Sequence, residues 1–380
     1  MLVHHRRRSR SGNVLVLTAF LMVVLFGLLT FAIDMGYLQV IRSQLQTSAD
    51  ATALAAAWDL IDEGVMTGAA DPNGAIAEAE ASAGEYASLN LVGGIAPALA
   101  EDDITIGHIA DPANLNMTFT NPSLFNAVQV RVRRSPQQNG DIALFFAKVL
   151  GFNRASMQAE ATAMFLANTS GFTTPSSGGA LEILPFALDM ETWNSLMART
   201  TGDDNFAWDP DSETVSSGTD NVLEVNLFPQ DTGSPGNRGT VDIGNTNNAV
   251  PDIRRQILYG ISEADLVPHG GSLEFDANGQ LFLNGDTGIS AGVKSQLEQI
   301  IGQPRMIPLF TAVSGNGNNA TYTIEAFAGI RLVEVCLTGS SKKTKRVMIQ
   351  PAEFEADGML PPNGTAPKSY FIHTPVYLVR

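Results

Sequence analysis

Cysteine, charge and histidine are all scarce in this chain of 380 residues. Charged residues make up only 16% of the sequence, which is too few for a disordered, solvated protein. The single cysteine, Cys336, cannot form an internal disulfide, so the fold must depend on its core. Cys336 lies within an apolar run at residues 332–337, and this predicts a buried structural thiol rather than a reactive one.

Positive charge is concentrated at the N-terminus, and this argues against nucleic acid as a partner. The net charge is −16; Arg6, Arg7, Arg8 and Arg10 give the first twelve residues +4, so the remainder carries −20. A surface that acidic repels a phosphate backbone. A later basic run at residues 342–346 stands between two strand-like runs, and we interpret it as a solvated hairpin loop.

Signatures of catalysis and of metal binding are also missing from the sequence. The five histidines lie in the N-terminal tail or far apart, so zinc spacing is absent. No serine-centred elbow and no phosphate-binding loop occurs. We therefore predict no catalytic residue, no cofactor and no enzymatic activity.

Asp-Thr-Gly occurs twice, beginning at Asp231 and at Asp286, and it provides the remote enzymatic alternative. Aspartic proteases use two such loops to share one proton between facing carboxylates. Each loop should follow a buried apolar strand directly, whereas Pro229 and Gln230 precede Asp231 here. We interpret both as turn or cap chemistry, with Asp286 or Thr287 capping the helix that follows.

Two acidic clusters, at residues 203–204 and 209–213, provide the other alternative. Calcium needs several convergent oxygen ligands, and the spacing does not match an EF-hand loop. We favour a solvated acidic loop. A membrane-anchored module that binds calcium or a surface polymer stays open as the alternative function.

A long apolar run near the N-terminus predicts a membrane anchor. Residues 12–33 carry no charge, and residues 14–33 would span about 30 Å as a helix, the thickness of the hydrocarbon core. The four arginines precede the run, so the N-terminus is expected in the cytoplasm. No small-residue cleavage site follows, so we expect a basic tail at 1–12 and a retained transmembrane anchor at 13–36.

The helical pattern continues beyond the membrane. Apolar and small residues recur at three- and four-residue steps, so we expect one helix from about Asn13 to Ile61 that docks on a sheet or on neighbouring helices. Gln46 and Asp50 lie on one of its faces. Ala49, Ala53 and Ala57 form a row that lets another backbone approach closely, and Trp58 is expected in the core.

The order of these features is distinctive. It comprises the basic tail, Gly12, the apolar span, Asp34 within Ile-Asp-Met-Gly, Leu45, Gln46, and an alanine-rich run that includes Ala49, Asp50, Ala53 and Ala57. This segment resembles the N-terminal part of the TadE/TadG-like proteins of the Tad (Flp) pilus assembly system. The resemblance implies an envelope protein without catalysis in this segment, whose anchor and long helix contact other pilus-assembly subunits.

Three features depart from the family pattern. Thr52 interrupts the alanine run, and Leu17 occupies the fifth position after Gly12, where processed pilin-like subunits carry glutamate. No Asp-x-Ser-x-Ser occurs, so the metal site of larger relatives cannot be carried over.

The remaining patterns predict an α+β fold in two units. Residues 37–167 form a small pilin-like unit with the long helix on a sheet. Residues 168–180, rich in Thr, Ser, Gly and Pro, form a linker, and residues 181–380 form a second, mainly antiparallel α+β domain. Helices are expected at residues 75–89, 141–150, 250–259 and 289–301. Strands are expected at residues 104–109, 128–132, 156–166, 182–188, 222–228, 306–313, 322–337, 346–350 and 370–379, with a hairpin at 273–283.

These expectations converge on one function. We predict a non-enzymatic, single-pass protein of the bacterial cell membrane with a cytoplasmic N-terminus and an extracytoplasmic bulk. It would support Tad/Flp pilus assembly or surface attachment.

Overall fold

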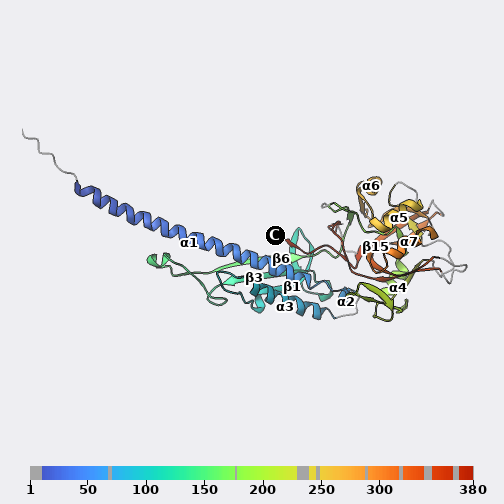
Figure 1. Ribbon diagram of the computed structural model, residues 1–380, viewed down its shortest axis with the longest axis horizontal. Helices are drawn as coiled ribbons and strands as arrows, with labels where there is room; N and C mark the ends of the chain where they lie inside the picture. Colours follow the sequence, from blue (N-terminus) through green and yellow to red (C-terminus); the bar gives the residue numbers. More distant parts are fainter. Residues whose placement is uncertain are drawn as a thin grey trace, which may run out of the picture.

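The computed structural model describes residues 11–66, 71–175, 178–228, 239–244, 249–286, 290–315, 320–337, 345–362 and 368–379. Figure 1 shows an elongated molecule in which one long helix projects well beyond a folded body. The predicted class, α+β with a long N-terminal helix followed by strand-rich structure, is confirmed.

The projecting element is α1 (Ser11–Trp58), an unbroken helix of 48 residues. Its sequence contains no proline and is rich in leucine and alanine, which favour helix. The predicted limits, residues 13 and 61, are therefore close to those observed. A short α2 (Glu63–Met66) and then α3 (Pro72–Leu89) follow it.

The helix α3 packs along the C-terminal half of α1. Asp71 caps it by accepting a hydrogen bond from the Asn73 N–H at 3.0 Å, and Pro72 occupies its first turn. Its buried side chains recur every four residues and are all alanine: Ala75, Ala79, Ala83 and Ala87. Small side chains on both helices allow a close approach of the two backbones.

A five-stranded antiparallel sheet lies under α1 in the order β2-β1-β3-β6-β22. Val128, Val130 and Val132 are fully buried and pack in one cluster with α1, whereas the alternate residues face away. The strands are β1 (Ile104–Asp111), β2 (Asn114–Thr118), β3 (Ala127–Arg134), β6 (Met157–Met164) and β22 (Tyr377–Val379).

A second, eight-stranded sheet occupies the far end of the molecule and closes on itself. Its pairings run from β16 through β14, β12, β8 and β15 back to β16, while β11, β17 and β20 extend it. The strands are β8 (Phe186–Asp189), β11 (Val225–Phe228), β12 (Gly239–Val241), β14 (Leu281–Asp286), β15 (Pro304–Ser314), β16 (Ala320–Cys336), β17 (Arg346–Pro351) and β20 (Ser369–Tyr370).

Side chains at alternate positions of these strands point to opposite faces and form two separate core clusters. Leu283, Tyr322 and Ile324 belong to one cluster, which also includes Phe172 of the small three-stranded sheet. Ile307 and Leu309 belong to the other, which packs against the covering helices. These helices are α4 (Met190–Met197), α5 (Val250–Tyr259) and α7 (Lys294–Gln299), whereas Leu266 of α6 (Glu263–Leu266) belongs to the first cluster.

Short paired strands complete the fold. They are β4 (Ile142–Ala143) with β5 (Arg154–Ala155); β7 (Gly171–Thr173) with β13 (Ser272–Glu274) and β19 (Met359–Leu360); β9 (Phe206–Asp209) with β10 (Thr214–Ser217); and β18 (Phe354–Glu355) with β21 (Ile372–His373). Short 3₁₀ turns are η1 (Glu101–Asp103), η2 (Pro122–Leu124), η3 (Ala147–Leu150), η4 (Val267–His269) and η5 (Ala291–Val293).

Several predicted elements differ from those observed. Instead of a helix at 141–150, the chain forms β4 and then the single turn η3, which ends at the left-handed Gly151 as expected for a cap. The turn predicted at residues 276–279 exists, but its flanking strands β13 and β14 join different sheets, so the hairpin was wrong. The strand at 370–379 is broken into short pieces.

Two predictions about burial were also wrong. Trp58 is 55% exposed rather than in the core, because it lies at the end of α1 on the side away from α3 and the sheet. Cys336 is half-buried rather than fully enclosed, since it is the last residue of β16.

The C-terminal segment ties the two sheets together. Its strand β22 pairs with β6 of the first sheet, and the backbone of Thr374 donates to the Leu166 carbonyl at 2.9 Å. The Leu166 N–H in turn donates to Thr374 Oγ1 at 2.9 Å, in a buried position. Nearby, the ring of the buried His373 bonds Glu353 at 2.8 Å. The division of the chain at residues 168–180 stays a prediction, and part of that segment forms β7.

Thr374→Val should destabilise the fold measurably. The substitution keeps the shape but leaves the buried N–H of Leu166 without its acceptor, which costs about 1–3 kcal/mol. We expect the apparent Tm of the full chain in detergent to fall by several degrees. Thr118→Val, at an exposed position of β2, is the control and should change stability by less than about 0.5 kcal/mol. Equal melting of both variants would contradict the role of Thr374.

Candidate functional site: the anchor helix and its seat

The N-terminal part of α1 presents apolar surface that the protein itself does not cover. The large apolar residues between positions 14 and 33 have exposed fractions of 44% to 76%. The helix is long and apolar enough to cross a membrane, and none of its most apolar stretch is buried within the molecule. Such an uncovered apolar surface on a helix of this length is typical of a membrane anchor.

Asp34, the first charged residue after this stretch, is bound by the protein rather than by solvent. Only 4% of its surface is exposed. Its carboxylate accepts three backbone hydrogen bonds, from Phe145 at 2.8 Å, Phe146 at 3.0 Å and Ala147 at 2.6 Å. These N–H groups lie at the start of the turn η3. The carboxylate therefore caps this turn and holds the segment between β4 and β5 against α1.

The rest of α1 is seated on α3 and the first sheet. Ile41, Leu45, Ala49, Ala53 and Ala57 are fully buried. They share one cluster with alanines of α3 and valines of β3. The row of alanines thus packs against the protein's own elements, and it offers no surface to another subunit.

Gln46 and Asp50 join α1 to the sheet from another face of the helix. The Gln46 side-chain amide donates to Asp50 Oδ1 at 2.7 Å and to the Glu160 carbonyl of β6 at 3.3 Å. The helix also binds the loop after α3, because Gln44 accepts a hydrogen bond from Gly93 N–H at 2.8 Å. Gly93 has a φ of +60°, and a side chain there would collide with Ile41.

Other site residues predicted from sequence fall outside this seat. Arg6, Arg7, Arg8 and Arg10 lie outside the described residues, and Gly12 lies in the first turn of α1. The exposed side of α1 beyond the apolar stretch includes Val40, which is 53% exposed, and Trp58. This side is the part of the helix that remains accessible once α3 and the sheet are in place.

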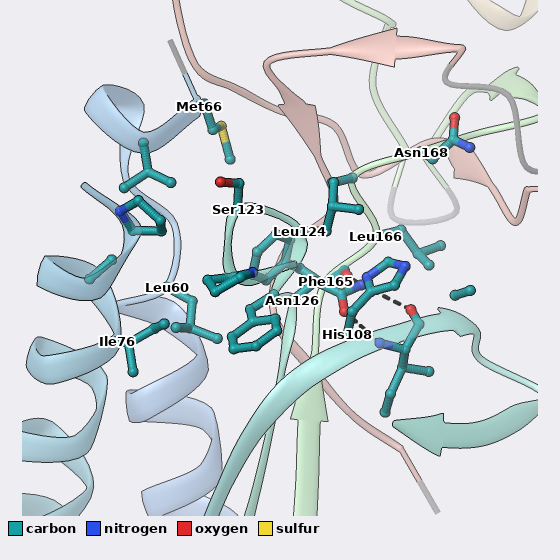
Figure 2. A pocket seen from close by; sticks show the side chains of 18 of the residues that line it. Leu60, Met66, Ile76, His108, Ser123, Leu124, Asn126, Phe165, Leu166 and Asn168 are labelled. Carbon is teal, nitrogen blue, oxygen red and sulfur yellow. Dashed lines mark hydrogen bonds between the residues drawn. The ribbon is translucent and has the colours of Figure 1, made fainter. Parts of the chain in front are cut away.

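A cavity of about 520 Å³ lies beyond the C-terminal end of α1. Figure 2 shows Leu60, Ile76 and Phe165 around it, together with His108 of β1 and Asn126, which directly precedes β3. Asn126 is buried and bonds the backbone of Ile109 and of Phe165, so it fixes the strands rather than facing a ligand.

This cavity has no catalytic pairing of groups. His108 is the one ionisable residue among those that line it, and its Nδ1 has no hydrogen-bond partner within the described part of the chain. Hydrolysis through a covalent intermediate needs a nucleophile beside a base, and hydrolysis by an activated water needs an acid and a base, so one histidine alone supplies neither arrangement. The lining is otherwise mainly apolar.

The acidic clusters are used for local structure. Asp209 accepts hydrogen bonds from the Asp211 N–H and the Ser212 hydroxyl, which together hold its pKa below the usual range. The fully buried Glu224 accepts from the Asn205 and Phe206 N–H groups; burial nevertheless raises its pKa. In the described ranges, no three His, Cys, Asp or Glu side chains are grouped so that they could hold a metal ion.

The Asp-Thr-Gly segments show no paired carboxylates in the described structure. Asp231 lies outside the described residues. Asp286 is the last residue of β14, where its backbone is paired with Thr240, and the next turn, η5, is capped by Ser290 instead; Thr287 lies outside the described residues. Burial, together with the charge of Asp286, raises the pKa of the Tyr322 hydroxyl to about 12.

Sequence reasoning missed the segment that Asp34 binds. Phe145, Phe146 and Phe152 are exposed on it, and Phe145 packs edge-on against Tyr37 of α1 at 5.1 Å between ring centroids. The sequence pattern predicts a short helix over residues 141–150 here. A signal was present, because three phenylalanines within eight residues form an apolar group too large for so short an element to bury.

Asp34→Asn should release this segment without unfolding the body. The amide retains one acceptor oxygen, but its NH₂ group faces backbone donors, which costs about 1–3 kcal/mol locally. We expect amide hydrogen exchange at Phe145, Phe146 and Ala147 to accelerate by about 10- to 100-fold in the full chain in nanodiscs. Glu80→Gln, an exposed carboxylate on α3, should leave these amides unchanged. Unaltered exchange in Asp34→Asn would refute the capping role.

Comparison with known proteins gives two matches, both in the N-terminal part. The TadE/G-like family of Flp pilus assembly matches residues 12–59, which correspond to α1. The Tad-like Flp pilus-assembly family matches residues 55–163, which include α3 and the first sheet up to β6. No curated protein and no solved structure matches the chain. The uncovered apolar helix and the two families together fit a membrane-anchored pilus-assembly protein, and through residues 12–163 the chain is a TadE/TadG-like protein.

Proposed function

We propose that this protein is a non-enzymatic, single-pass envelope protein that supports Tad/Flp pilus assembly from the outer side of the cell membrane. The observation that carries the proposal is the continuity of α1. One helix supplies an uncovered apolar surface at one end and a fully buried packing surface at the other. Lipid is the environment in which the first surface is stable, and the folded body is therefore held next to the bilayer.

The orientation follows from charge. Four arginines precede the apolar stretch, and the rest of the chain is strongly acidic. Positive residues flanking a membrane helix are retained on the cytoplasmic side. The proposed topology thus has the N-terminus inside and everything after Asp34 outside.

Other assembly subunits would bind the exposed side of α1. The alanine row is already occupied by α3 and the sheet. Val40 and Trp58 remain accessible, and tryptophan is among the residues enriched at protein interfaces. A scaffolding role of this kind needs no catalytic group.

A phosphatase domain fused at the C-terminus should test the topology. Alkaline phosphatase requires an oxidising compartment for its disulfides, so we expect an active fusion. Replacing the four arginines with glutamate should lower this activity several-fold, because the retention signal is lost. The proposal would be contradicted if the phosphatase fused to the unmodified chain were inactive, while a reporter that works only in the cytosol were active at the same C-terminal position.

Photo-crosslinking in cells that build the pilus should test the partner surface. A photoreactive phenylalanine at Val40 or Trp58 is expected to yield adducts with pilus-assembly subunits, identified by mass spectrometry. Tyr259 on α5 is a matched control, because it is 71% exposed but lies in the far sheet's covering layer. Adducts from Val40 and Trp58 that contain only lipid or a second copy of the chain would count against the assignment.

A further inference from the structure

The segment between β4 and β5 exposes three phenylalanine side chains that do not contribute to the protein's core. Phe145, Phe146 and Phe152 are 58%, 39% and 66% exposed. Backbone hydrogen bonds nevertheless hold the two sides of the segment together. Leu144 N–H donates to the Asn153 carbonyl at 3.1 Å, and Phe152 N–H to the Ala147 carbonyl at 3.0 Å. Exposed phenylalanines on a defined backbone indicate a contact surface rather than a loosely packed loop.

The position of this segment along α1 is fixed. Asp34 binds three of its backbone N–H groups, and Tyr37 packs against Phe145. Asp34 directly follows the apolar stretch that ends with Ile33, which is itself 44% exposed. In Figure 1 the segment is the green excursion that lies beside α1, ahead of the rest of the folded body. Its phenylalanines therefore lie level with the end of the apolar stretch.

The charge of the segment also differs from the rest of the chain. Between Ile142 and Ser156 the only charged residues are Lys148 and Arg154, and both side chains are exposed. The protein as a whole carries a net charge of −16. Aromatic residues beside basic residues, without acid, are typical of surfaces that bind the headgroup region of a bilayer with anionic lipid.

We propose that residues 144–154, the interfacial loop, insert Phe145, Phe146 and Phe152 into the headgroup region of the leaflet that α1 leaves. Lys148 and Arg154 lie beside lipid phosphates. This inference rests on the proposed membrane insertion of α1 and adds a second, independent lipid contact. Two contacts, one along the helix and one beside it, fix the tilt and rotation of the folded body against the membrane. A single helix crossing cannot do this.

The test places a tryptophan in the full chain, reconstituted in liposomes with and without brominated lipid. Phe152→Trp reports on the interfacial loop. Phe282→Trp is the matched control, since Phe282 is 54% exposed on β14, in the far sheet. Leu25→Trp reports on the anchor itself, because Leu25 is 61% exposed within the apolar stretch. Emission is compared with that of the unsubstituted protein.

We expect the added emission of Phe152→Trp to be blue-shifted relative to Phe282→Trp and to be quenched by brominated lipid. Leu25→Trp should be quenched as well. Quenching at Leu25 without quenching at Phe152 would overturn the interfacial loop and leave the anchor intact. A blue shift at Phe152 that brominated lipid does not quench would indicate contact with a second copy of the chain instead of lipid, and it would overturn the proposal too. Absence of quenching at both sites would refute the anchor.

A second variant separates lipid contact from folding. Phe146→Ser with Phe152→Ser removes exposed aromatic groups and leaves the Asp34 hydrogen bonds, which involve only backbone donors. The thermal stability of this variant in detergent should match that of the unsubstituted protein. In liposomes, amide hydrogen exchange across the interfacial loop should be faster in the variant than in the unsubstituted protein. Equal exchange of the two proteins in liposomes would contradict insertion.

Discussion

The apolar surface of α1 between residues 14 and 33 is the constraint from which the rest of the molecule follows. A protein that leaves a run of leucine, valine and phenylalanine uncovered must place it in lipid, since water would drive it to associate. Because the same helix continues without a break into the folded body, the position of the body is set by where the apolar stretch ends. Asp34 marks that point in the sequence and, through its three hydrogen bonds, in the structure.

Beyond Asp34 the helix changes partners from lipid to protein, and its side chains change size accordingly. Large side chains dominate the apolar stretch, where nothing has to fit between them. Alanine dominates the part that meets α3, where two backbones approach closely. Gln46 and Asp50 add a polar link to β6, so the helix is bound along its length by apolar packing and by hydrogen bonds at one side. The result is a stiff connection between membrane and body.

The sequence allowed the helices and most long strands to be predicted, because these depend on local periodicity. The limits of α1 and α5 and the positions of the strands β15 and β16 all follow from patterns within a few residues. What could not be predicted depends on distant segments. The strand β14 pairs with β16 rather than with its neighbour β13, and Trp58 is 55% exposed because none of the later segments that the structure describes covers it. Likewise, no local pattern relates Asp34 to Phe145, since long-range contacts bring them together.

The pairing of β22 with β6 has a consequence for how the protein is made. The strand β6 ends at Met164, and its second neighbour is formed only by residues 377–379. During synthesis, that edge of the first sheet stays open until all of the intervening chain has been made. An open edge can pair with any strand that reaches it. The first sheet, although encoded early, is therefore the last to be completed, and a chain that stops before residue 377 would leave the edge at β6 unpaired.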